Sequence, residues 1–356
     1  MIRSFKLAAF GLAAALGLSA MGDGAQAQTR ELTFGEFGPN RGTRAAGIEW
    51  LDSQLRERTG GELGLNIIWG GALLGAKTAA QGISDGVADM GSIVPVYAPG
   101  KLISYEAADV PQFGDEWVGM RAVHELMNTN EAALAEWDAA NMVYLTNYTT
   151  GPTQLLSKEP IRTMSDLDGK TFRATGPFVA ALESAGASTV SVGQPKVYEA
   201  LSNGTVDGST TYYYVMKAYK HYELVDYLTE LNMGQVLAFG IAMNKASFES
   251  LKPEHQEIVK DLGDDFIDYM AAKMYESRQS VKAELQEGIE GHTVEIVEPD
   301  GQMRAELIAI AEKDALSWLD KAADKGMDGD AMLGEFRALI AKYSEERDAK
   351  GYPWER

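Results

Sequence analysis

Arg173 is the residue whose chemistry is easiest to define from its neighbours. It lies in KTFRATG, residues 170–176, a run of apolar and small residues that favours a short buried strand. A guanidinium is planar, and its fork of N–H donors matches the oxygens of a carboxylate or a sulfonate. A buried arginine needs an anion. Either a bound ligand supplies that anion, or Glu183 or Asp207 supplies it from within the chain.

A run of three tyrosines follows this region, at residues 212–214. Thr211 is expected to cap a helix that begins at Tyr212. Apolar residues then recur at helical spacing, which predicts one face packed in the core. That face comprises Tyr212, Val215, Met216 and Tyr219. Tyr213 and Tyr214 lie off it in the first turn, where free backbone N–H groups favour an anion. For these two tyrosines a pocket wall and a surface position both remain open.

A calcium site and a cofactor site are the other chemistries to consider. The run DKGMDGDAMLGE has Asp324, Asp328 and Glu335 at positions that carry oxygen ligands in calcium loops, but Gly326 occupies another ligand position. We therefore interpret this run as the joint between two helices. The four histidines are scattered, and there is no phosphate-binding glycine loop and no nucleophile elbow. We expect no cofactor and no metal.

The N-terminus has the three parts of a secretory signal peptide. Arg3 and Lys6 form a basic start, residues 7–18 are apolar, and residues 25–27 read Ala-Gln-Ala, a cleavage site of small residues. The apolar run is short for a membrane span of ~20 residues. We predict an exported mature chain that starts at Gln28, with the periplasm as its expected location.

Composition narrows the possible partners. Removing Arg3, Lys6 and Asp23 from the 32 basic and 52 acidic residues leaves a net charge of −21. That balance argues against nucleic acid and against an anionic membrane surface, but not against a small anion bound by one buried arginine. The chain has no cysteine, which excludes disulfides and thiolate chemistry. Its length exceeds the roughly 250–300 residues that one core holds, so two domains are expected.

The elements that must position Arg173 alternate between strands and helices. In the first unit we expect strands at 31–38, 62–71, 87–96 and 142–150, and helices at 43–61, 76–86 and 116–128. This order predicts an α/β unit with mainly parallel strands. A second α/β unit carries Arg173. A strand at 235–244 then runs back to the first unit, a long helix covers 253–287, and two acidic helices end the chain. Two units joined by several crossings form a hinge and a cleft.

Five blocks of this sequence, in order, carry a resemblance to a known family. They are GGELGLNIIWGGALLG, GISDGVADMGS, MSDLDGKTFRATG, VYEALSNGTVDG and MNKASFESLKPEHQEIV. The sequence resembles the solute-binding subunit of tripartite ATP-independent periplasmic (TRAP) transporters over nearly the whole mature chain. The resemblance implies an α/β, two-lobed binding protein with hinge-linked mixed-sheet lobes and a long connecting helix. Such a protein is no enzyme; it hands its solute to a membrane permease driven by an ion gradient. We expect a monomer.

The resemblance and the pattern of elements together set the expected domains. They are a signal peptide at 1–27, a first lobe at 28–150 and 239–278, a second lobe at 151–238 and 279–325, and a C-terminal helical segment at 326–356.

The resemblance also implies which residues form the binding site, when positions of this sequence are matched to the family. The arginine that fixes the ligand's carboxylate in the family corresponds to Arg173. An asparagine usually ends the strand of the VDG run, and Thr211 stands there instead. Tyr212 and Tyr214 are expected beside it.

Further positions that are polar in sialic-acid-binding members differ here. Phe37 replaces a polar residue, Val94 an acid, Tyr97 an arginine and Thr153 a second arginine. One arginine among aromatic walls suits a small monocarboxylate with an apolar body. An aromatic acid of the benzoate type fits best, and an aliphatic keto or hydroxy acid or a sulfonate remains open.

Two other functions are compatible with the sequence. One is an exported α/β enzyme that acts on a carboxylate with Asp89 or Asp207 as its base. The other is a ligand-sensing partner of a membrane kinase.

Overall fold

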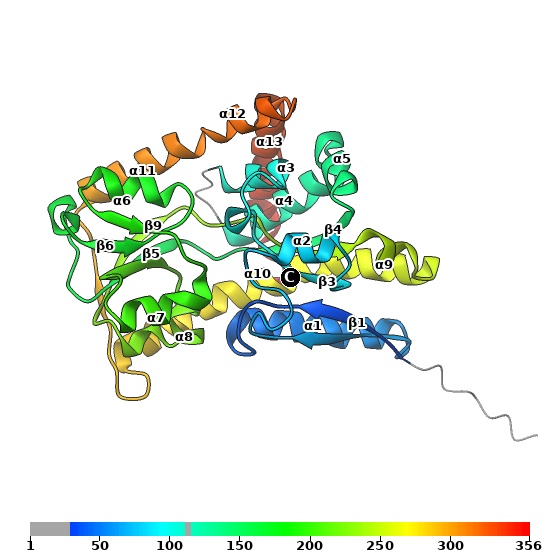
Figure 1. Ribbon diagram of the computed structural model, residues 1–356, viewed down its shortest axis with the longest axis horizontal. Coiled ribbons are helices and arrows are strands. Elements are labelled where there is room, and N and C mark those ends of the chain that lie inside the picture. The colour runs from blue at the N-terminus through cyan, green and yellow to red at the C-terminus, as the bar shows by residue number, and fades with distance from the viewer. Residues whose placement is uncertain (1–28, 111–114) are drawn as a thin grey trace, which may run out of the picture.

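Two β-sheets with helices packed on them lie side by side as two lobes (Figure 1). The structure is a computed structural model that describes residues 29–110 and 115–356. The signal peptide predicted at 1–27 therefore lies outside the described residues. Among those residues, no helix is both long and apolar enough to span a bilayer.

The first sheet has the strand order β2-β1-β3-β10-β4. Its strands are β1 (Arg30–Gly35), β2 (Leu63–Ile68), β3 (Met90–Ile93), β10 (Phe239–Asn244) and β4 (Met142–Tyr148). Strands β1, β2 and β3 are parallel, because α1 (Gly42–Arg58) and α2 (Ala79–Ser84) return the chain to the same edge. Strand β10 enters from the other lobe and runs antiparallel to β3 and β4. The prediction of mainly parallel strands is therefore correct for β1–β3 and wrong for β10.

The second sheet has the order β11-β9-β5-β8-β6-β7. Its strands are β5 (Thr153–Ser157), β6 (Thr171–Arg173), β7 (Ser188–Val190), β8 (Gly208–Thr211), β9 (Tyr227–Met233) and β11 (Glu295–Val297). The helices α6 (Phe178–Ser184), α7 (Val197–Ser202) and α8 (Tyr213–Ala218) belong to this lobe. Arg173 ends β6, which lies between β7 and β8 in the interior of the sheet.

The lobes are joined by two crossing segments, residues 149–152 and 234–238, and by a long helix. The crossing segments bond to each other: Thr150 N donates to Val236 O at 3.2 Å, and Val236 N donates to Thr150 Oγ1 at 3.0 Å. Helix α10 (Pro253–Glu287) has 35 residues, about 50 Å of helix. It contacts α1 and β4 of the first lobe and α8 and β11 of the second.

The hinge-linked, mixed-sheet architecture and its long helix are as predicted from the sequence. The chain passes from one sheet to the other near the predicted boundaries after residues 150 and 238. The full set of domain bounds stays a prediction.

The remaining helices pack mainly on the first lobe, except α11, which lies on the second. They are α3 (Ile103–Glu106), α4 (Glu116–Thr129), α5 (Glu131–Ala139), α9 (Lys245–Glu249), α11 (Gly301–Ala315), α12 (Trp318–Asp324) and α13 (Gly329–Lys350). Three helices follow β11 rather than the two predicted, because the chain breaks at 316–317 and again at 325–328. Helix α11 covers the second lobe, and α12 and α13 reach the first (Figure 1).

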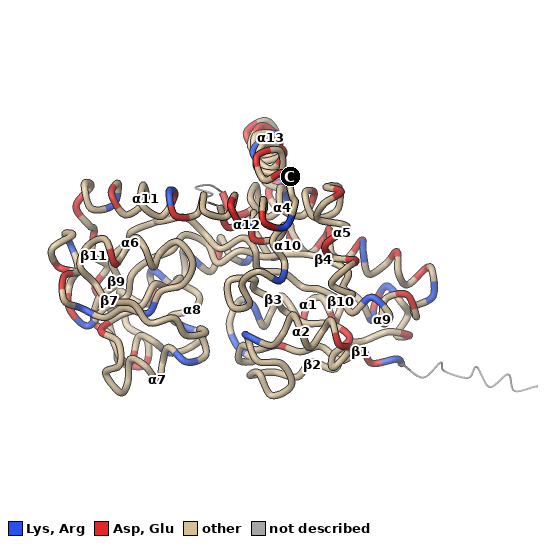
Figure 2. Tube along the Cα trace, turned by 45° about the horizontal axis from the view of Figure 1, so that its top comes forward, with Lys and Arg blue, Asp and Glu red and all other residues tan. Residues whose placement is uncertain are grey.

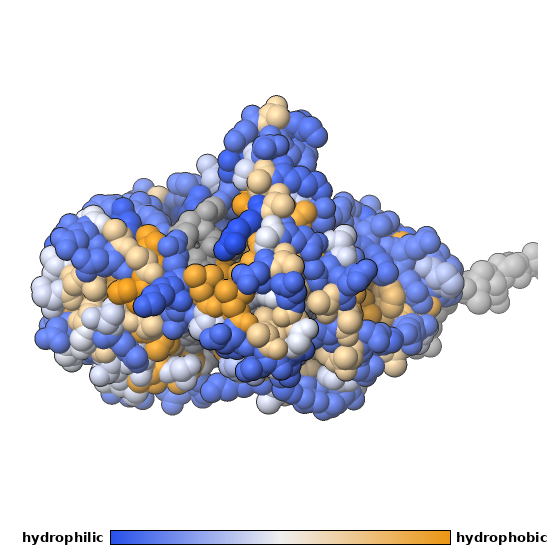
Figure 3. All heavy atoms as spheres, turned by 90° about the horizontal axis from the view of Figure 1, so that it is seen from above, coloured by the Kyte–Doolittle hydropathy of each residue, from blue (hydrophilic) through white to orange (hydrophobic). Residues whose placement is uncertain are grey.

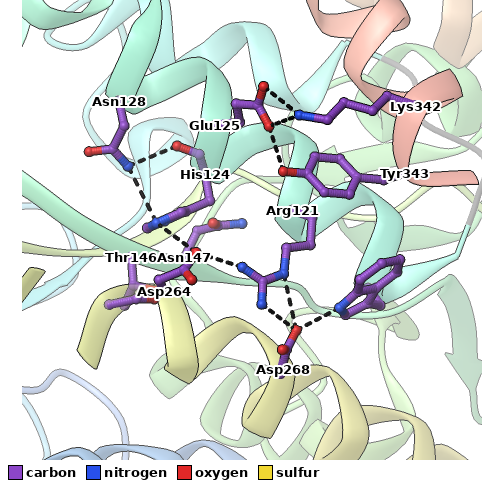
Figure 4. Close-up of polar contacts among 12 residues, drawn as sticks. Arg121, His124, Glu125, Asn128, Thr146, Asn147, Asp264, Asp268, Lys342 and Tyr343 are labelled. Atoms are coloured by element: carbon purple, nitrogen blue, oxygen red, sulfur yellow. Dashed lines mark hydrogen bonds and ion pairs between the residues drawn. The ribbon is translucent and has the colours of Figure 1, made fainter. Parts of the chain in front are cut away.

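A polar network fastens α4 to α10 and α13 (Figure 4). Arg121 Nη1 donates to Asp264 at 2.6 Å and its Nε to Asp268 at 3.0 Å, while Lys342 donates to Glu125 at 2.7 Å. Burial lowers the pKa of the neighbouring His124 to about 4. These contacts hold α10 and α13 against α4.

The joint predicted at the calcium-like run lies between α12 and α13. Asp328 caps α13 by accepting a hydrogen bond from Ala331 N at 2.9 Å. Within the described part of the chain, no group of three or more His, Cys, Asp or Glu side chains is placed to hold a metal.

The outer surface carries both signs of charge. Lys and Arg are interspersed with Asp and Glu over both lobes and along α11–α13 (Figure 2). The face seen from above is mostly hydrophilic, with small hydrophobic groups between the polar ones (Figure 3).

Asp109 links the first lobe to a crossing segment and provides a pH-dependent prediction. Its Oδ1 accepts hydrogen bonds from Leu237 N at 2.8 Å and Ala238 N at 2.9 Å, and burial raises the pKa of this carboxyl to about 7. A raised folded-state pKa means that the stabilising contribution is complete below about pH 4 and is lost as the pH rises through about 7.

We therefore expect Asp109→Asn to stabilise the protein at pH 7.5 by about 1–2 kcal/mol and to change little at pH 4. The amide oxygen can accept both backbone bonds, while the charge that burial disfavours is gone. Thermal melting at both pH values checks this, with Asp85→Asn on the surface as control. A substitution that destabilises equally at both pH values would show that the charge of Asp109 is irrelevant.

Candidate functional site

A small cavity lies between the two lobes. Its volume is about 30 Å³, room for about one water molecule. Five of the eight predicted site residues line it: Phe37, Val94, Tyr97, Tyr212 and Tyr214. The others on its wall are Arg44, Val96, Thr150, Thr175, Gln194, Val215, Val236 and Phe239. This conformation is closed, so a ligand the size of an aromatic ring requires the lobes to separate.

Two larger hollows border the lobes, of about 490 and 330 Å³. The larger one is broad, and its lysines are paired: Lys217 with Glu284, Lys220 with Glu290 and Lys273 with Glu276. The small cavity is the better candidate site, because the predicted residues converge on it and its walls come from both lobes.

Arg173 lies directly behind the cavity wall. Its side chain is buried, with 1% of the residue exposed. Nε donates to Val192 O at 2.9 Å, and Nη2 approaches the Tyr97 hydroxyl at 3.4 Å. Within residues 29–110 and 115–356 it forms no ion pair. The internal partners considered above are engaged elsewhere: Glu183 accepts from Thr189 Oγ1 at 2.5 Å, and Asp207 from Thr171 N at 2.8 Å. A buried guanidinium without an anion is costly.

The Tyr97 hydroxyl connects the two lobes. Tyr97 ends a single helical turn, Pro95–Tyr97, that follows β3 of the first lobe. Its oxygen accepts from Arg173 Nη2 at 3.4 Å and from Gln194 N at 3.3 Å, both in the second lobe. These bonds are long and therefore weak. Because they occupy the acceptor side of the oxygen, the phenol proton is left to be donated to another group.

Several buried polar atoms of the second lobe have no hydrogen-bond partner among the described residues. They are Gln194 Nε2, Thr153 Oγ1, Thr211 Oγ1 and both ring nitrogens of His221. The register places Thr211 two residues beyond Ser209, which is opposite Arg173, and Gln154 opposite Thr211. Native proteins pair most buried polar atoms, so these groups are available to hydrogen-bond a ligand or water.

His221 is held neutral in the same region. Burial lowers its pKa to about 3, and the positive charge of Arg173 acts in the same direction. A neutral imidazole adds no second positive charge beside the guanidinium. Arg173 is therefore the cation of this end of the cavity.

The tyrosine run differs from its prediction. Thr211 does not cap a helix, because it still belongs to β8; the helix begins at Tyr213, and Tyr212 is its N-cap without a side-chain bond. Tyr212 is extended, so Tyr212 and Tyr214 lie on the same side, with ring centroids 6.3 Å apart. Tyr213 faces the other way and donates to Glu230 at 2.7 Å. Tyr212 and Tyr214 are cavity wall, and Tyr213 packs in the second-lobe core.

Arg44 is a cavity residue that the sequence interpretation missed. It forms a buried ion pair with Glu36 at 3.2 Å, and its Nη2 donates to the Tyr219 hydroxyl at 2.9 Å. Its guanidinium lies over the rings of Phe37 and Phe239, 4.9 and 5.5 Å from their centroids. The sequence did contain one sign of this role. Arg44 lies in the first turn of a helix, where a positive charge opposes the helix dipole, so another group must stabilise it.

Two lobes with separate sheets, joined by crossing segments and with a small cavity between them, define the class of two-lobed solute-binding proteins. The chain belongs to family 7 of the bacterial extracellular solute-binding proteins, DctP, whose model matches residues 34–318. This is a family of solute receptors that serve transport, not of enzymes. Asp89, one of the bases considered above, has a structural role, because it accepts bonds from Thr33 N at 2.8 Å and Ser247 Oγ at 2.6 Å.

Individual relatives are distant in sequence and close in fold. The uncharacterized protein YiiZ of Salmonella typhimurium is 24% identical over 216 residues, which are 60% of this chain and 66% of YiiZ, just under two thirds of its length. A TRAP solute-binding protein of Rhodoferax ferrireducens, solved with copurified benzoate, is 25% identical with a TM-score of 0.75 over 89% of this chain and 99% of its own.

A marine metagenome TRAP solute-binding protein specific for aromatic acid ligands, solved with metahydroxyphenylacetate, is also 25% identical. Its TM-score is 0.74 over 88% of this chain and 98% of its own.

Proposed function

We propose that this protein is a periplasmic TRAP receptor that captures a small monocarboxylate with an apolar, aromatic body. It is exported by a signal peptide cleaved after residue 27, acts as a monomer and delivers the acid to membrane permease subunits. The observation that carries the proposal is the buried Arg173, which has no acid partner in the described chain and contacts Val192 O and the Tyr97 hydroxyl. The solved relatives that hold aromatic acids support it.

Arg173 binds the carboxylate together with three neighbours. The Tyr97 hydroxyl and Gln194 Nε2 are donors without an acceptor, and Thr211 Oγ1 is unpartnered behind them. Thr153 Oγ1, on the neighbouring strand β5, is also buried without a partner. When the lobes open, the Tyr97 hydroxyl separates from Arg173 and the ligand can enter. When they close again, the carboxylate accepts hydrogen bonds from the donors of both lobes. Charge-assisted hydrogen bonds of this kind contribute about 1.5–3 kcal/mol each.

The body of the ligand contacts an apolar wall. Phe37, Val94, Tyr212 and Tyr214 supply it, two residues from each lobe. Burying ~100–150 Å² of an aromatic ring contributes about 3 kcal/mol. Micromolar binding requires about 8 kcal/mol, so the carboxylate bonds and the ring together reach this range. An aliphatic keto or hydroxy acid, or a sulfonate, would use the same arginine with less ring contact.

Titration calorimetry with a panel of acids tests the proposal. We expect benzoate-type acids to bind with micromolar dissociation constants and the corresponding methyl esters not to bind, because the ester removes the anion. Aliphatic acids of similar size should bind at least ten times more weakly. Equal binding of acid and ester would rule out a site built on Arg173.

Tyr97→Phe isolates one donor. The ring and its apolar contacts remain, and only the hydroxyl is lost. We expect affinity for the tightest acid to fall about 10-fold or more, corresponding to at least ~1.4 kcal/mol, without a change in melting temperature. Tyr275→Phe, at a surface position on α10, is the control. Unchanged affinity would mean that the Tyr97 hydroxyl does not donate to the ligand.

A further inference from the structure

The cavity has two different ends. Arg44 lines the cavity, and so does Tyr97, whose hydroxyl lies 3.4 Å from Nη2 of Arg173 behind the wall. Tyr212 and Tyr214 lie side by side on the same wall, with ring centroids 6.3 Å apart. We call the part of the wall at Tyr97 and Arg173 the Arg173 end, and the part at Arg44 the Arg44 end.

The Arg44 end carries no net charge. Glu36 is fully buried and pairs with Arg44 at 3.2 Å, so the two charges compensate each other. Arg173, by contrast, has no acid partner in the described chain. An anion is therefore favoured at one end and has no uncompensated cation to meet at the other.

The Arg44 end still has hydrogen-bonding capacity. The bond to Tyr219 and the ion pair to Glu36 both use Arg44 Nη2, and the described contacts include no hydrogen bond from its Nε or Nη1. Glu36 Oε2 is buried without a partner, because Gly38 N and Arg44 both bind Oε1. This end offers donors and an acceptor together, which is the pattern that a hydroxyl group satisfies.

Gly38 fixes the position of Arg44. A Cβ at residue 38 would lie 1.2 Å from Arg44 Nη2, so only glycine lets the guanidinium lie there. The rings of Phe37 and Phe239, stacked at 5.8 Å, hold the other face of the guanidinium. An alanine at 38 would displace Arg44 without changing any charge, which gives a clean way to test its position.

We propose that the Glu36–Arg44 pair selects acids that carry a neutral hydrogen-bonding group, such as a hydroxyl, opposite the carboxylate, and rejects diacids. A second carboxylate would meet an arginine that is already neutralised, together with the negative charge of Glu36. The inference rests on the proposed function, because it assumes that the first carboxylate binds Arg173.

Calorimetry with benzoate, the three hydroxybenzoates and the three benzenedicarboxylates tests this inference. In the wild type, we expect one hydroxybenzoate to bind at least tenfold tighter than benzoate, and every dicarboxylate at least tenfold weaker. Glu36→Gln should keep the bond from Gly38 N and release the charge of Arg44, raising the affinity of one dicarboxylate at least tenfold relative to benzoate.

Gly38→Ala should abolish the preference for the hydroxybenzoate while benzoate binding stays within about threefold. Gly75→Ala, where an added Cβ meets only Thr78 Oγ1 at 3.5 Å, is the matched control and should leave every affinity unchanged.

The outcomes separate the two proposals. If benzoate binds in the wild type but Glu36→Gln and Gly38→Ala leave the ranking of the acids unchanged, the Glu36–Arg44 inference is wrong and the receptor proposal stands. If no acid binds, the receptor proposal is wrong, and so is the Glu36–Arg44 inference that depends on it. Should Glu36→Gln not fold, Gly38→Ala decides the matter alone, since it retains both charges.

Discussion

Arg173→Met should abolish ligand binding and leave the protein folded. Methionine has a similar length and no charge, so it fills the buried position, and a bound carboxylate loses its cationic partner and keeps only neutral donors such as the Tyr97 hydroxyl. Removing one member of a buried charge pair costs about 3–5 kcal/mol, so we expect affinity to fall by at least ~100-fold. Folding should survive because Arg173 forms no ion pair in the described chain and loses chiefly its bond to Val192 O, worth about 1 kcal/mol.

Calorimetry with the tightest acid measures the loss, and thermal melting measures the fold. Arg173→Lys should be intermediate, because an ammonium keeps the charge and cannot make a two-pronged bond. Arg162→Met, on the surface of the same lobe, is the matched control, since its ion pair with Glu295 is exposed. Binding that persists in a folded Arg173→Met protein would contradict the carboxylate site at this arginine.

Local signals were sufficient for the long connecting helix, α10, but not for every helix, since the three helices after β11 were predicted as two. The predicted and observed bounds of α10 coincide, because Pro253 suits a first helical turn and Gly288 interrupts the helix. Strands β5 and β9 were not predicted. Both carry an amide that pairs across the sheet: Gln154 Nε2 donates to Asn232 Oδ1 at 2.8 Å, and Asn232 N donates to Gln154 Oε1 at 3.0 Å. A strand whose polar groups pair with a segment almost 80 residues away has no local signature.

The site residues also fall into those that the sequence could predict and those that it could not. Phe37, Val94 and Tyr97 were predicted by matching their positions to members of the family, and all three line one cavity. Arg44 and Gln194 could not, because their roles depend on neighbours that only the folded chain supplies. The helical spacing also assigned the tyrosines to the wrong faces. Tyr212 is extended rather than helical, so its ring lies on the same side as that of Tyr214.

Gly263 is the position where we expect a single methyl group to harm the fold most. It lies in α10 against β4, and an added Cβ would stand 2.2 Å from Leu145 O. Thr146 Oγ1 also donates to Gly263 O at 2.6 Å, so helix and strand meet backbone to backbone. Helix propensity alone predicts that Gly263→Ala stabilises the protein by about 1 kcal/mol. We expect the reverse, a loss of about 2–4 kcal/mol and a melting temperature lower by roughly 5–10 °C.

The two glycine-to-alanine substitutions in helices, at 263 and at 334, are expected to change stability in opposite directions. Gly334 lies within helix α13, and an added Cβ there meets nothing within 4 Å, so Gly334→Ala should stabilise by about 0.5–1 kcal/mol. Helix α10 cannot shift away from β4 to relieve the clash at 263 without disturbing the ion pairs of Arg121 with Asp264 and Asp268. Because the same helix contacts both lobes, the loss should appear as one cooperative transition at lower temperature. Melting temperatures that rise equally in both variants would show that α10 does not pack closely on β4.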